Sequence, residues 1–366
     1  MKRSRVPKNE NSQRIIGIDL FCGAGGLTRG LEKAGLSVAL GVDLDPACEF
    51  PYQANNGAVF LLKSVSELSE SDLAPAFGGA EYKLLAGCAP CQPFSTYQQK
   101  SDPSDDRWNL LMEFARLVEE TQPELVTMEN VPRLAEQDVF LQFVERLEEN
   151  GFHVSFEVIN CADYSVPQQR NRLVLLASKL GEIRMIRPTT PQEKRKTVKQ
   201  AIGKLPKIEA GERHPKDPLH QASRLSELNL TRIRASKPGG SWKDWDESLV
   251  AECHKKPTGK TYPSVYGRMV WDEPAPTMTT QYYGFGNGRF GHPEQDRAIS
   301  LREGAVLQSF PNGYKFVPNG ASISTKTIGR LIGNAVPVNL GRAIGKSIVK
   351  HIVEIEGRRA NQEEAA

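Results

Sequence analysis

The sequence predicts an α/β fold in which a doubly wound, mainly parallel sheet is followed by a second, smaller and irregular domain. Over residues 14–180, short apolar runs alternate with stretches whose apolar residues recur at helical spacing. This alternation is typical of parallel strands joined by crossover helices. After residue 180, Pro, Gly, Lys and Arg become frequent and the helical periodicity fades. Helical spacing returns near the C-terminus.

Each element follows from the local pattern of apolar residues. Strands are expected where short apolar runs stand between polar or glycine-rich segments, at residues 14–21, 38–42, 83–86, 125–128, 152–159 and 173–177. Helices are expected where apolar residues lie three and four positions apart, at residues 27–34, 110–120, 139–149, 327–332 and 340–356. The predicted segments are a disordered lead (1–13), a first domain (14–180), a second domain (181–324), a return to the first (325–357) and a tail (358–366).

The composition is that of an ordinary soluble globular protein. Of the 366 residues, 39% are hydrophobic and 25% are charged. No apolar run approaches the roughly 20 residues that span a membrane. The N-terminal segment is basic but lacks the apolar core of a secretory signal. We therefore expect a cytoplasmic protein.

Six scattered cysteines are expected to be reduced thiols in that compartment. Cys88 and Cys91 form a CxxC pair, for which half a zinc site or a redox pair are the alternatives. Zinc would need a second pair of close ligands, and the adjacent Cys253 and His254 are poorly spaced to chelate together. We therefore expect no metal.

Charge is unevenly distributed along the chain. The formal net charge is +3, whereas residues 181–260 alone hold 18 Lys and Arg against 10 Asp and Glu. A basic region joined to a nearly neutral one indicates a polyanionic partner. A well-solvated, loop-rich insertion is the alternative.

A glycine-rich turn at Asp19–Gly26 (DLFCGAGG) lies between the first expected strand and helix. Glycines there let the backbone approach a ligand, and the helix N-terminus offers N–H groups that lack partners. Asp43 ends the second strand, where an acidic residue typically binds ribose hydroxyls. The spacing is not G-x-G-x-x-G, which favours a mononucleoside cofactor over a dinucleotide. A purely structural turn remains the alternative.

A cysteine stands beside prolines in the segment Gly87–Ser95 (GCAPCQPFS), just after an expected strand. Ligands of α/β sheets bind at the carboxyl ends of the strands. Pro90 and Pro93 fix the backbone on either side of Cys91. This arrangement is typical of a thiol that is held in place for reaction.

Two further segments carry candidate polar groups. Glu129 ends an expected strand and could supply a proton, although a helix N-cap or a surface charge is the alternative. Gln168, Arg170 and Arg172 alternate along an extended segment and would face one side. An exposed, charged strand edge would give the same pattern.

Five short motifs occur in one order: DLFCGAGG, PCQ, ENV, QxRxR and GNAVP, the last at residues 333–337. Together they resemble the DNA (cytosine-5)-methyltransferase family of the bacterial restriction-modification type. Residues 297–311 resemble the ninth motif of that family, with Val306 where an arginine is usual. The resemblance covers roughly residues 14–180 and 265–345, and it implies the S-adenosylmethionine-dependent methyltransferase fold.

The resemblance also implies site residues. The catalytic set would be Cys91, Glu129, Arg170 and Arg172. The S-adenosyl-L-methionine site would comprise Phe21, Gly23, Ala24, Gly25, Gly26, Asp43, Leu44, Ser64, Pro90, Leu110, Asn334 and Ala335. Ser64 departs from the aspartate that is common in relatives, and Ala89 departs from the commoner double proline.

The implied activity is transfer of a methyl group to carbon 5 of a flipped cytosine in a specific double-stranded DNA sequence, through a covalent Cys91 adduct. The basic 181–290 stretch, with Trp242, Trp245, Arg232 and Arg234, would be the target-recognition domain. A monomer is implied, and any cognate restriction endonuclease would act separately. The resemblance gives Cys88 no role, so Cys88→Ser is expected to be mild.

Two other functions fit the same fold. One is a tRNA cytosine-5 methyltransferase, but the Cys-Phe-Thr signature of that branch is absent from the sequence. The other is a catalytically inactive DNA-binding regulator, which would predict a damaged nucleophile or acid. Both Cys91 and Glu129 are present, so the active DNA enzyme is the preferred interpretation.

Overall fold

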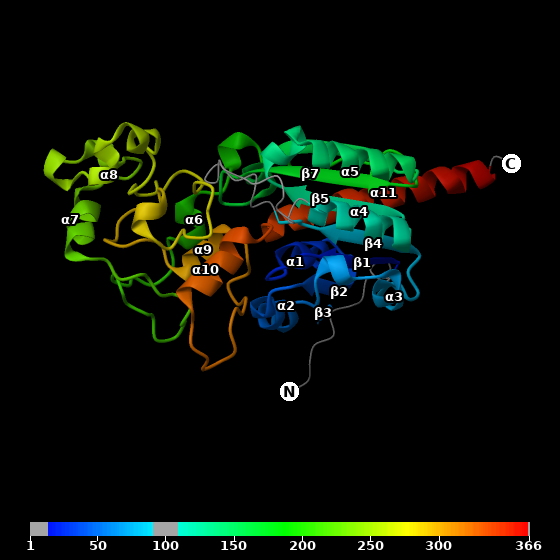
Figure 1. The fold of residues 1–366 in the computed structure, drawn as a ribbon, viewed down its shortest axis with the longest axis horizontal. Helices are drawn as coiled ribbons and strands as arrows, with labels where there is room; N and C mark the ends of the chain where they lie inside the picture. Colours follow the sequence, from blue (N-terminus) through cyan, green and yellow to red (C-terminus); the bar gives the residue numbers. More distant parts are fainter. Residues whose placement is uncertain (1–13, 91–108, 365–366) are drawn as a thin grey trace. The chain divides into compact units, whose positions relative to one another are not determined.

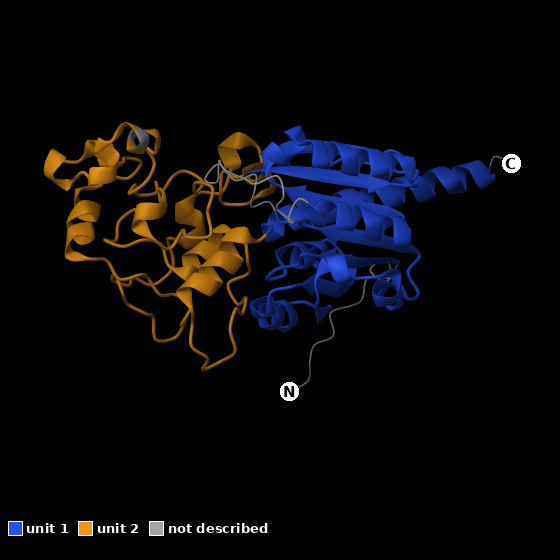
Figure 2. Cartoon of the chain, in the orientation of Figure 1, with its two compact units in different colours: residues 1–160, 171–189, 336–366 blue, residues 161–170, 190–335 orange. Residues whose placement is uncertain are grey.

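The computed structural model describes residues 14–90 and 109–364. The chain divides into two compact units (Figure 2). The first unit comprises residues 1–160, 171–189 and 336–366, and the second comprises residues 161–170 and 190–335. The C-terminal segment from residue 336 therefore belongs with the N-terminal part of the chain.

The first unit is built on a seven-stranded sheet with the order β3-β2-β1-β4-β5-β7-β6. Its strands are β1 (Ile15–Leu20), β2 (Ser37–Asp43), β3 (Val59–Leu62), β4 (Tyr82–Gly87), β5 (Leu125–Asn130), β6 (His153–Asn160) and β7 (Asn171–Ser178). The first five strands are mutually parallel, and β7 runs antiparallel to both β5 and β6. The predicted mainly parallel, doubly wound sheet is confirmed, and β7 is its reversed strand.

Helices cover both faces of this sheet. They are α1 (Gly26–Lys33), α2 (Glu49–Asn55), α3 (Glu70–Leu73), α4 (Asn109–Thr121), α5 (Asp138–Glu149) and α11 (Val338–Glu364). The strand order reverses direction after β1, so right-handed crossovers place α1 and α4 on opposite faces. Figure 1 shows α4 and α5 together over one face, with α11 passing behind the sheet.

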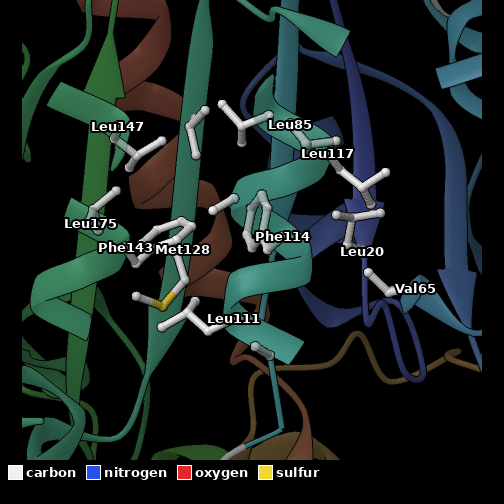
Figure 3. Close-up of a cluster of buried hydrophobic side chains, with 14 of the residues drawn as sticks. Leu20, Val65, Leu85, Leu111, Phe114, Leu117, Met128, Phe143, Leu147 and Leu175 are labelled. Carbon is white, nitrogen blue, oxygen red and sulfur yellow. The ribbon is translucent and has the colours of Figure 1, made fainter. Parts of the chain in front are cut away.

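The core of the first unit lies between the sheet and helices α4 and α5. Phe114 and Phe143 meet there with ring centroids 5.4 Å apart, and both are fully buried. Leu85 and Met128 approach them from the strands (Figure 3). This apolar layer holds β4 and β5 in place against α4 and α5. The carboxyl ends of these two strands carry the candidate catalytic segments.

Helices α1 and α11 approach each other closely through glycine. A side chain at Gly30 would place its Cβ atom 2.5 Å from backbone atoms of Gly341 and Arg342. No side chain fits in that space. The C-terminal helix can therefore pack on α1 only because glycines, Gly30 on α1 and Gly341 on α11, stand at the contact. This contact joins the two ends of the sequence within one unit.

The second unit holds only short helices: α6 (Val198–Ile202), α7 (Glu227–Ala235), α8 (Glu252–Lys255), α9 (Leu301–Leu307) and α10 (Thr325–Asn334). A small apolar cluster includes Trp242, Trp245 and Phe285. With so little regular structure, loop carbonyls need other donors. The guanidinium of buried Arg268 donates to carbonyls of Ile233, Ser236, His292 and Gln295.

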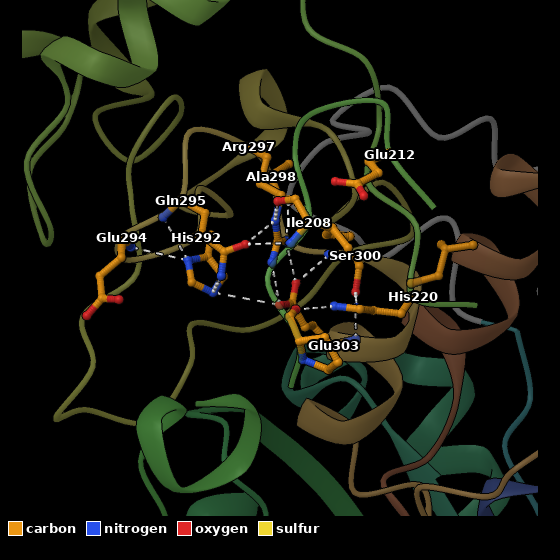
Figure 4. Close-up of polar contacts among 12 residues, drawn as sticks. Ile208, Glu212, His220, His292, Glu294, Gln295, Arg297, Ala298, Ser300 and Glu303 are labelled. Atoms are coloured by element: carbon orange, nitrogen blue, oxygen red, sulfur yellow. Dashed lines mark hydrogen bonds and ion pairs between the residues drawn. The ribbon is translucent and has the colours of Figure 1, made fainter. Parts of the chain in front are cut away.

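A second buried guanidinium organises the approach to α9. Arg297 is fully buried and donates to both carboxylate oxygens of Glu303, at 2.7 and 2.8 Å. Glu303 also accepts from the backbone of Ser300, in the capping box that starts α9. His220 contacts the Ser300 hydroxyl at 2.8 Å (Figure 4). The start of α9 is thus held by hydrogen bonds of buried polar side chains and not by pairing between strands.

Every strand and helix predicted from the sequence is present, with ends shifted by one or two residues, except that α11 ends eight residues beyond the predicted end. The prediction missed β3, the short α2 and α3 beside it, and the short helices α6 to α9 of the second unit. No helix among the described residues is long and apolar enough to cross a membrane.

Candidate active site

The glycine-rich turn joins β1 to α1 and contacts the end of β2. Gly23 and Gly25 adopt positive φ angles of 53° and 83°, a conformation that favours glycine. Asp43 Oδ2 accepts a 2.8 Å hydrogen bond from the Gly23 backbone N–H, and Oδ1 accepts from Asp45 N at 2.9 Å. Two parts of the predicted cofactor site are therefore brought together. Burial raises the pKa of the Asp43 carboxyl.

The space beside this turn is open. A Cβ atom added at Gly23 would meet nothing within 4 Å among the described residues. Leu44, directly after Asp43, exposes 70% of its surface. Ser64 lies just beyond Leu62, which pairs with Asp43 across β2 and β3. An apolar side chain and a hydroxyl residue thus flank the carboxyl ends of neighbouring strands.

Beneath the turn lies a buried carboxylate. Asp19 is 1% exposed, and its Oδ2 accepts from the Thr28 backbone at 3.2 Å and the Thr28 hydroxyl at 2.6 Å. Among the described residues, no hydrogen-bond donor reaches the buried Oδ1 atom. Burial raises the pKa of the Asp19 carboxyl to about 7. A cationic or N–H-bearing ligand would relieve both the missing hydrogen bond and the cost of burying charge.

These features fit S-adenosylmethionine. The molecule carries a positive charge, ribose hydroxyls and a flat purine, for which Asp19, Asp43 and Leu44 offer complementary groups. Phe21 and Leu110, both half-buried, belong to the turn and to the first turn of α4. Asn334 and Ala335 stand at the end of α10 in the second unit.

The candidate acid Glu129 is buried near the end of β5. It is 3% exposed, and its Oε1 lies 2.9 Å from Nε of Arg172 on the neighbouring strand β7. Its Oε2 lies 3.1 Å from Sγ of Cys88, just after β4. Glu129 is therefore neither a helix N-cap nor a surface charge. It is a buried carboxylate that is held from two sides.

The next residue anchors the segment that precedes the candidate nucleophile. Asn130 Nδ2 donates to the Ala89 carbonyl at 3.1 Å, and Cys88 N donates to Leu20 O at 3.3 Å. Pro90 is the last described residue of this segment, and Cys91 lies outside the described residues. The ENV motif thus fixes the start of the loop that carries PCQ.

Arg170 and Gln168 lie in the second unit. Arg170 donates to the carbonyls of Met278 at 2.8 Å and Gly333 at 3.2 Å. Gln168 Nε2 donates to Gln308 Oε1 at 3.0 Å, and its Oε1 accepts from Met278 N. Both side chains are buried, as is that of Arg172, so the exposed-edge interpretation does not hold.

Sequence reasoning missed two contributors. Cys88 was given no role, yet it contacts Glu129. Gln308 is fully buried and its amide donates to Ile332 O at 2.9 Å and Ala335 O at 3.2 Å, which organises the GNAVP segment. The sequence signal for Cys88 was its place just before PCQ, and the signal for Gln308 was its place within residues 297–311, which resemble the ninth motif.

The cysteines of the described residues were expected to be free thiols. Cys22, Cys48, Cys88, Cys161 and Cys253 form no disulfide with one another.

The tryptophans of the second unit were expected to contact DNA. Trp242 and Trp245 are each 7% exposed, and Arg232 donates to Leu249 O while lying over the Trp245 ring. Trp242 and Trp245 therefore belong to the apolar core of the second unit and not to its exposed surface.

The fold and site define an α/β protein with a glycine-rich turn and buried carboxylates at the carboxyl ends of its parallel strands, which is where ligands of such sheets bind. Comparison with known families extends this. The model of the family "C-5 cytosine-specific DNA methylase" matches residues 15–350. This chain belongs to that family and is a DNA (cytosine-5)-methyltransferase.

Individual relatives are similar to this chain over most of its length. The type II methylase M.HgiDII of Herpetosiphon aurantiacus is 51% identical over 345 residues, covering 93% of this chain and 97% of the relative. The type II methyltransferase M1.HphI of Haemophilus parahaemolyticus is 34% identical, covering 91% and 86%. A crystal structure of an E. coli prophage-encoded protein matches with a TM-score of 0.70 at 21% identity, covering 92% of this chain and 99% of that one. The last match supports the S-adenosylmethionine-dependent methyltransferase fold.

Proposed function

We propose that this chain transfers a methyl group from S-adenosylmethionine to carbon 5 of a cytosine that is flipped out of a specific duplex DNA sequence, through a covalent adduct with Cys91. The observation that carries the proposal is the buried Glu129, held by Arg172 at the end of β5. Asn130 ties the next position of the same strand end to the segment just before Cys91.

The residues divide the chemistry between them. The Cys91 thiolate would form a bond to carbon 6 of the ring, and the negative charge that this addition places on the ring would be offset by a proton that Glu129 donates to ring nitrogen 3. Carbon 5 thereby becomes nucleophilic. Bound S-adenosylmethionine supplies the methyl group on a sulfonium that leaves as a neutral thioether. Transfer of the carbon 5 proton to water would then form the carbon 5–carbon 6 double bond and break the carbon 6–sulfur bond, whose electron pair returns to the Cys91 thiolate.

Arg172 has a separate part in this scheme. Its guanidinium lies against Oε1 and offsets the negative charge of Glu129. The base would contact Oε2, which has a second lone pair beside the one that accepts from the Cys88 thiol. Arg170 is expected to act on the flipped base as well, in keeping with the family pattern. Its contacts to Met278 and Gly333 hold it in a defined position within the second unit.

The cofactor would be held by the first unit. Asp43 would bind the ribose, Asp19 would accept from the cofactor's cationic end, and Leu44 would cover the adenine. Gly23 and Gly25 would let the backbone approach. Support comes from the unpartnered Asp19 Oδ1 and from the open space over Gly23.

The second unit would recognise the target. Its exposed basic side chains can reach phosphates and base edges, and these include Lys204, Lys207, Arg213, Lys216, Arg224, Arg234, Lys237 and Lys243. The relatives named as type II methylases support a place in a restriction-modification system. A companion endonuclease would then act separately on the same sequence.

Bisulfite sequencing of DNA from cells that express the protein tests the activity and gives the target. One cytosine in a fixed sequence should be protected, and Cys91→Ser should abolish protection while DNA binding persists. Glu129→Gln should slow transfer by about 10²–10⁴-fold. Duplex DNA with 5-fluorocytosine should trap an adduct on Cys91. Unprotected duplex DNA together with a methylated tRNA would overturn the proposal in favour of the RNA enzyme.

A further inference from the structure

Cys88 is near the candidate nucleophile in the sequence and in contact with the candidate acid in the structure. It stands three positions before Cys91 in the sequence, and its Sγ atom lies 3.1 Å from Oε2 of Glu129. A carboxylate only accepts, so the contact has the thiol S–H donating to the carboxylate. The distance is well inside the range for a hydrogen bond to sulfur.

The contact completes the hold on the Glu129 carboxylate. Arg172 Nε lies 2.9 Å from Oε1, and Cys88 occupies Oε2. Arg172 pairs with Oε1 by charge, but the contact does not have the geometry of a hydrogen bond, so on its own it leaves the carboxylate able to turn about its last side-chain bond. The hydrogen bond from Cys88 to Oε2 restricts that rotation. Because Glu129 is 3% exposed, water is poorly placed to replace either partner.

The contact also links the catalytic loop to the acid. Cys88 N donates to Leu20 O, and Asn130 Nδ2 donates to Ala89 O at 3.1 Å. Two successive loop residues are thus tied to two successive residues of β5. One of the two contacts that join this segment to β5 is therefore made by the side chain of Cys88.

We propose that Cys88 is a positioning residue of the methyl-transfer site, which orients Glu129 through its thiol and keeps the acid in register with the loop that carries the nucleophile. This inference rests on the proposed function, because it assigns Cys88 a part in the chemistry of Glu129. The role belongs to the side chain at this position and not to a CxxC redox pair or a metal site.

The test compares alanine, which removes the donor, with serine, which keeps one. Cys88→Ala should lower the single-turnover methylation rate by roughly three- to tenfold, the range for one ordinary hydrogen bond, because a thiol is a weak donor. Cys88→Ser should restore at least half of the wild-type rate. The KM values for duplex DNA and S-adenosylmethionine should stay within about twofold, since Cys88 is proposed to touch neither.

A double-mutant cycle separates positioning from simple loss of structure. In a Glu129→Gln background, Cys88→Ala should change the remaining rate by less than about twofold, because the carboxylate it orients is gone. An equal loss in both backgrounds, or a Cys88→Ala variant as fast as wild type, would overturn the proposal. A wild-type enzyme inactive on every duplex would instead overturn the proposed function.

An independent readout needs no activity. The infrared S–H stretch of Cys88, isolated as the difference between wild type and Cys88→Ala, should lie at lower frequency than that of a thiol exposed to water. It should shift in Glu129→Gln. If the S–H stretching frequency were the same in wild type and in Glu129→Gln, the thiol would not be donating to this carboxylate.

Discussion

Arg172 Nε lies 2.9 Å from Glu129 Oε1, and this buried ion pair joins the antiparallel neighbours β7 and β5. Arg172 is 8% exposed and Glu129 is 3% exposed. A buried pair of this kind adds little net stability, but removal of one partner leaves a charge without compensation. The reversed strand β7 therefore supplies the cation that allows a carboxylate to be buried beside the catalytic loop.

The pair predicts strong coupling in stability. Arg172→Met should lower the free energy of unfolding by about 3–5 kcal/mol, because Glu129 is left buried without its cation. Combining it with Glu129→Gln should recover most of that loss, since no isolated charge remains. Urea denaturation of the two single variants and the double variant measures this. Additive losses would show that the two side chains are not energetically coupled.

The cofactor site predicts a specific loss on truncation of Asp43. Asp43→Ala should weaken S-adenosylmethionine binding by about 1.5–3 kcal/mol, the value of a lost hydrogen bond to a charged group. Glu49→Gln, which removes an exposed carboxylate from the start of α2, serves as the control and should bind normally. Calorimetry on the folded variants provides the affinities. Equal affinities for wild type and Asp43→Ala would move the ribose site elsewhere.

Asp19 predicts a pH-dependent stability. Its carboxyl has a folded-state pKa of about 7 against an ordinary value of 3.8. Between these values the folded state binds more protons than the unfolded state, so the stability of the ligand-free protein falls as pH rises. Asp19→Asn cannot titrate, and its stability advantage over wild type should grow from about pH 4 to pH 7 and then level off.

Thermal melting of wild type and Asp19→Asn across that pH range measures the difference. Glu67→Gln, which removes an exposed carboxylate, is the matched control and should show no such trend. S-adenosylmethionine should reduce the advantage of Asp19→Asn at pH 8, since a bound cation would compensate the buried charge. A difference that does not vary with pH would mean that Asp19 is not destabilised by burial.

The contact between α1 and α11 predicts opposite effects for two glycines. Gly30→Ala would place Cβ 2.5 Å from the backbone of the partner helix and should destabilise the protein by about 1–3 kcal/mol. Gly357→Ala, in an exposed part of α11 with nothing within 4 Å of its Cβ, should stabilise it by about 0.5–1 kcal/mol. Chemical denaturation compares them, and a tolerated Gly30→Ala would show that the helices are not in close contact.

Much of the first unit could be predicted because local pattern and fold agree there. The strand that ends at Gly87 and the helix around Phe114 carry clear apolar periodicity. The turn at Gly23 is predicted by the three glycines within four residues at positions 23–26. The sequence offers Arg170 and Arg172 as cations that could hold Glu129, but which of them does so depends on the register of two strands whose paired residues are more than 40 positions apart. The Cys88 contact depends on the same long-range geometry.

The second unit was less predictable for a different physical reason. Its structure rests on buried polar side chains such as Arg268 and Arg297, which donate to loop carbonyls and to Glu303. Such contacts follow no sequence period, so an arginine in the core looks like any other basic residue. Trp242 and Trp245 have the same ambiguity, because aromatic residues serve equally in small cores and at nucleic-acid interfaces.

The structure sharpens the test of target recognition. The composition alone suggests grafting a segment that ends near Tyr266 from a relative of different specificity. That boundary would separate Trp245 and Val265 from Phe285 and Ala298, with which they form one apolar cluster. We therefore expect a graft of residues 190–266 to be unstable. A graft of residues 190–335, which keeps the cluster together, should fold and carry the target sequence with it.

Bisulfite sequencing and thermal melting of both chimeras measure these outcomes. Within the native unit, Lys237→Ala should weaken binding to all duplexes alike and lower the salt dependence by roughly one unit if Lys237 contacts phosphate. Replacing an arginine that reads a base should instead relax one position of the target, at about 1–3 kcal/mol. A stable, active 190–335 chimera that still methylates the original sequence would place recognition outside residues 190–335, because every exposed basic side chain of that stretch would then have been exchanged without effect.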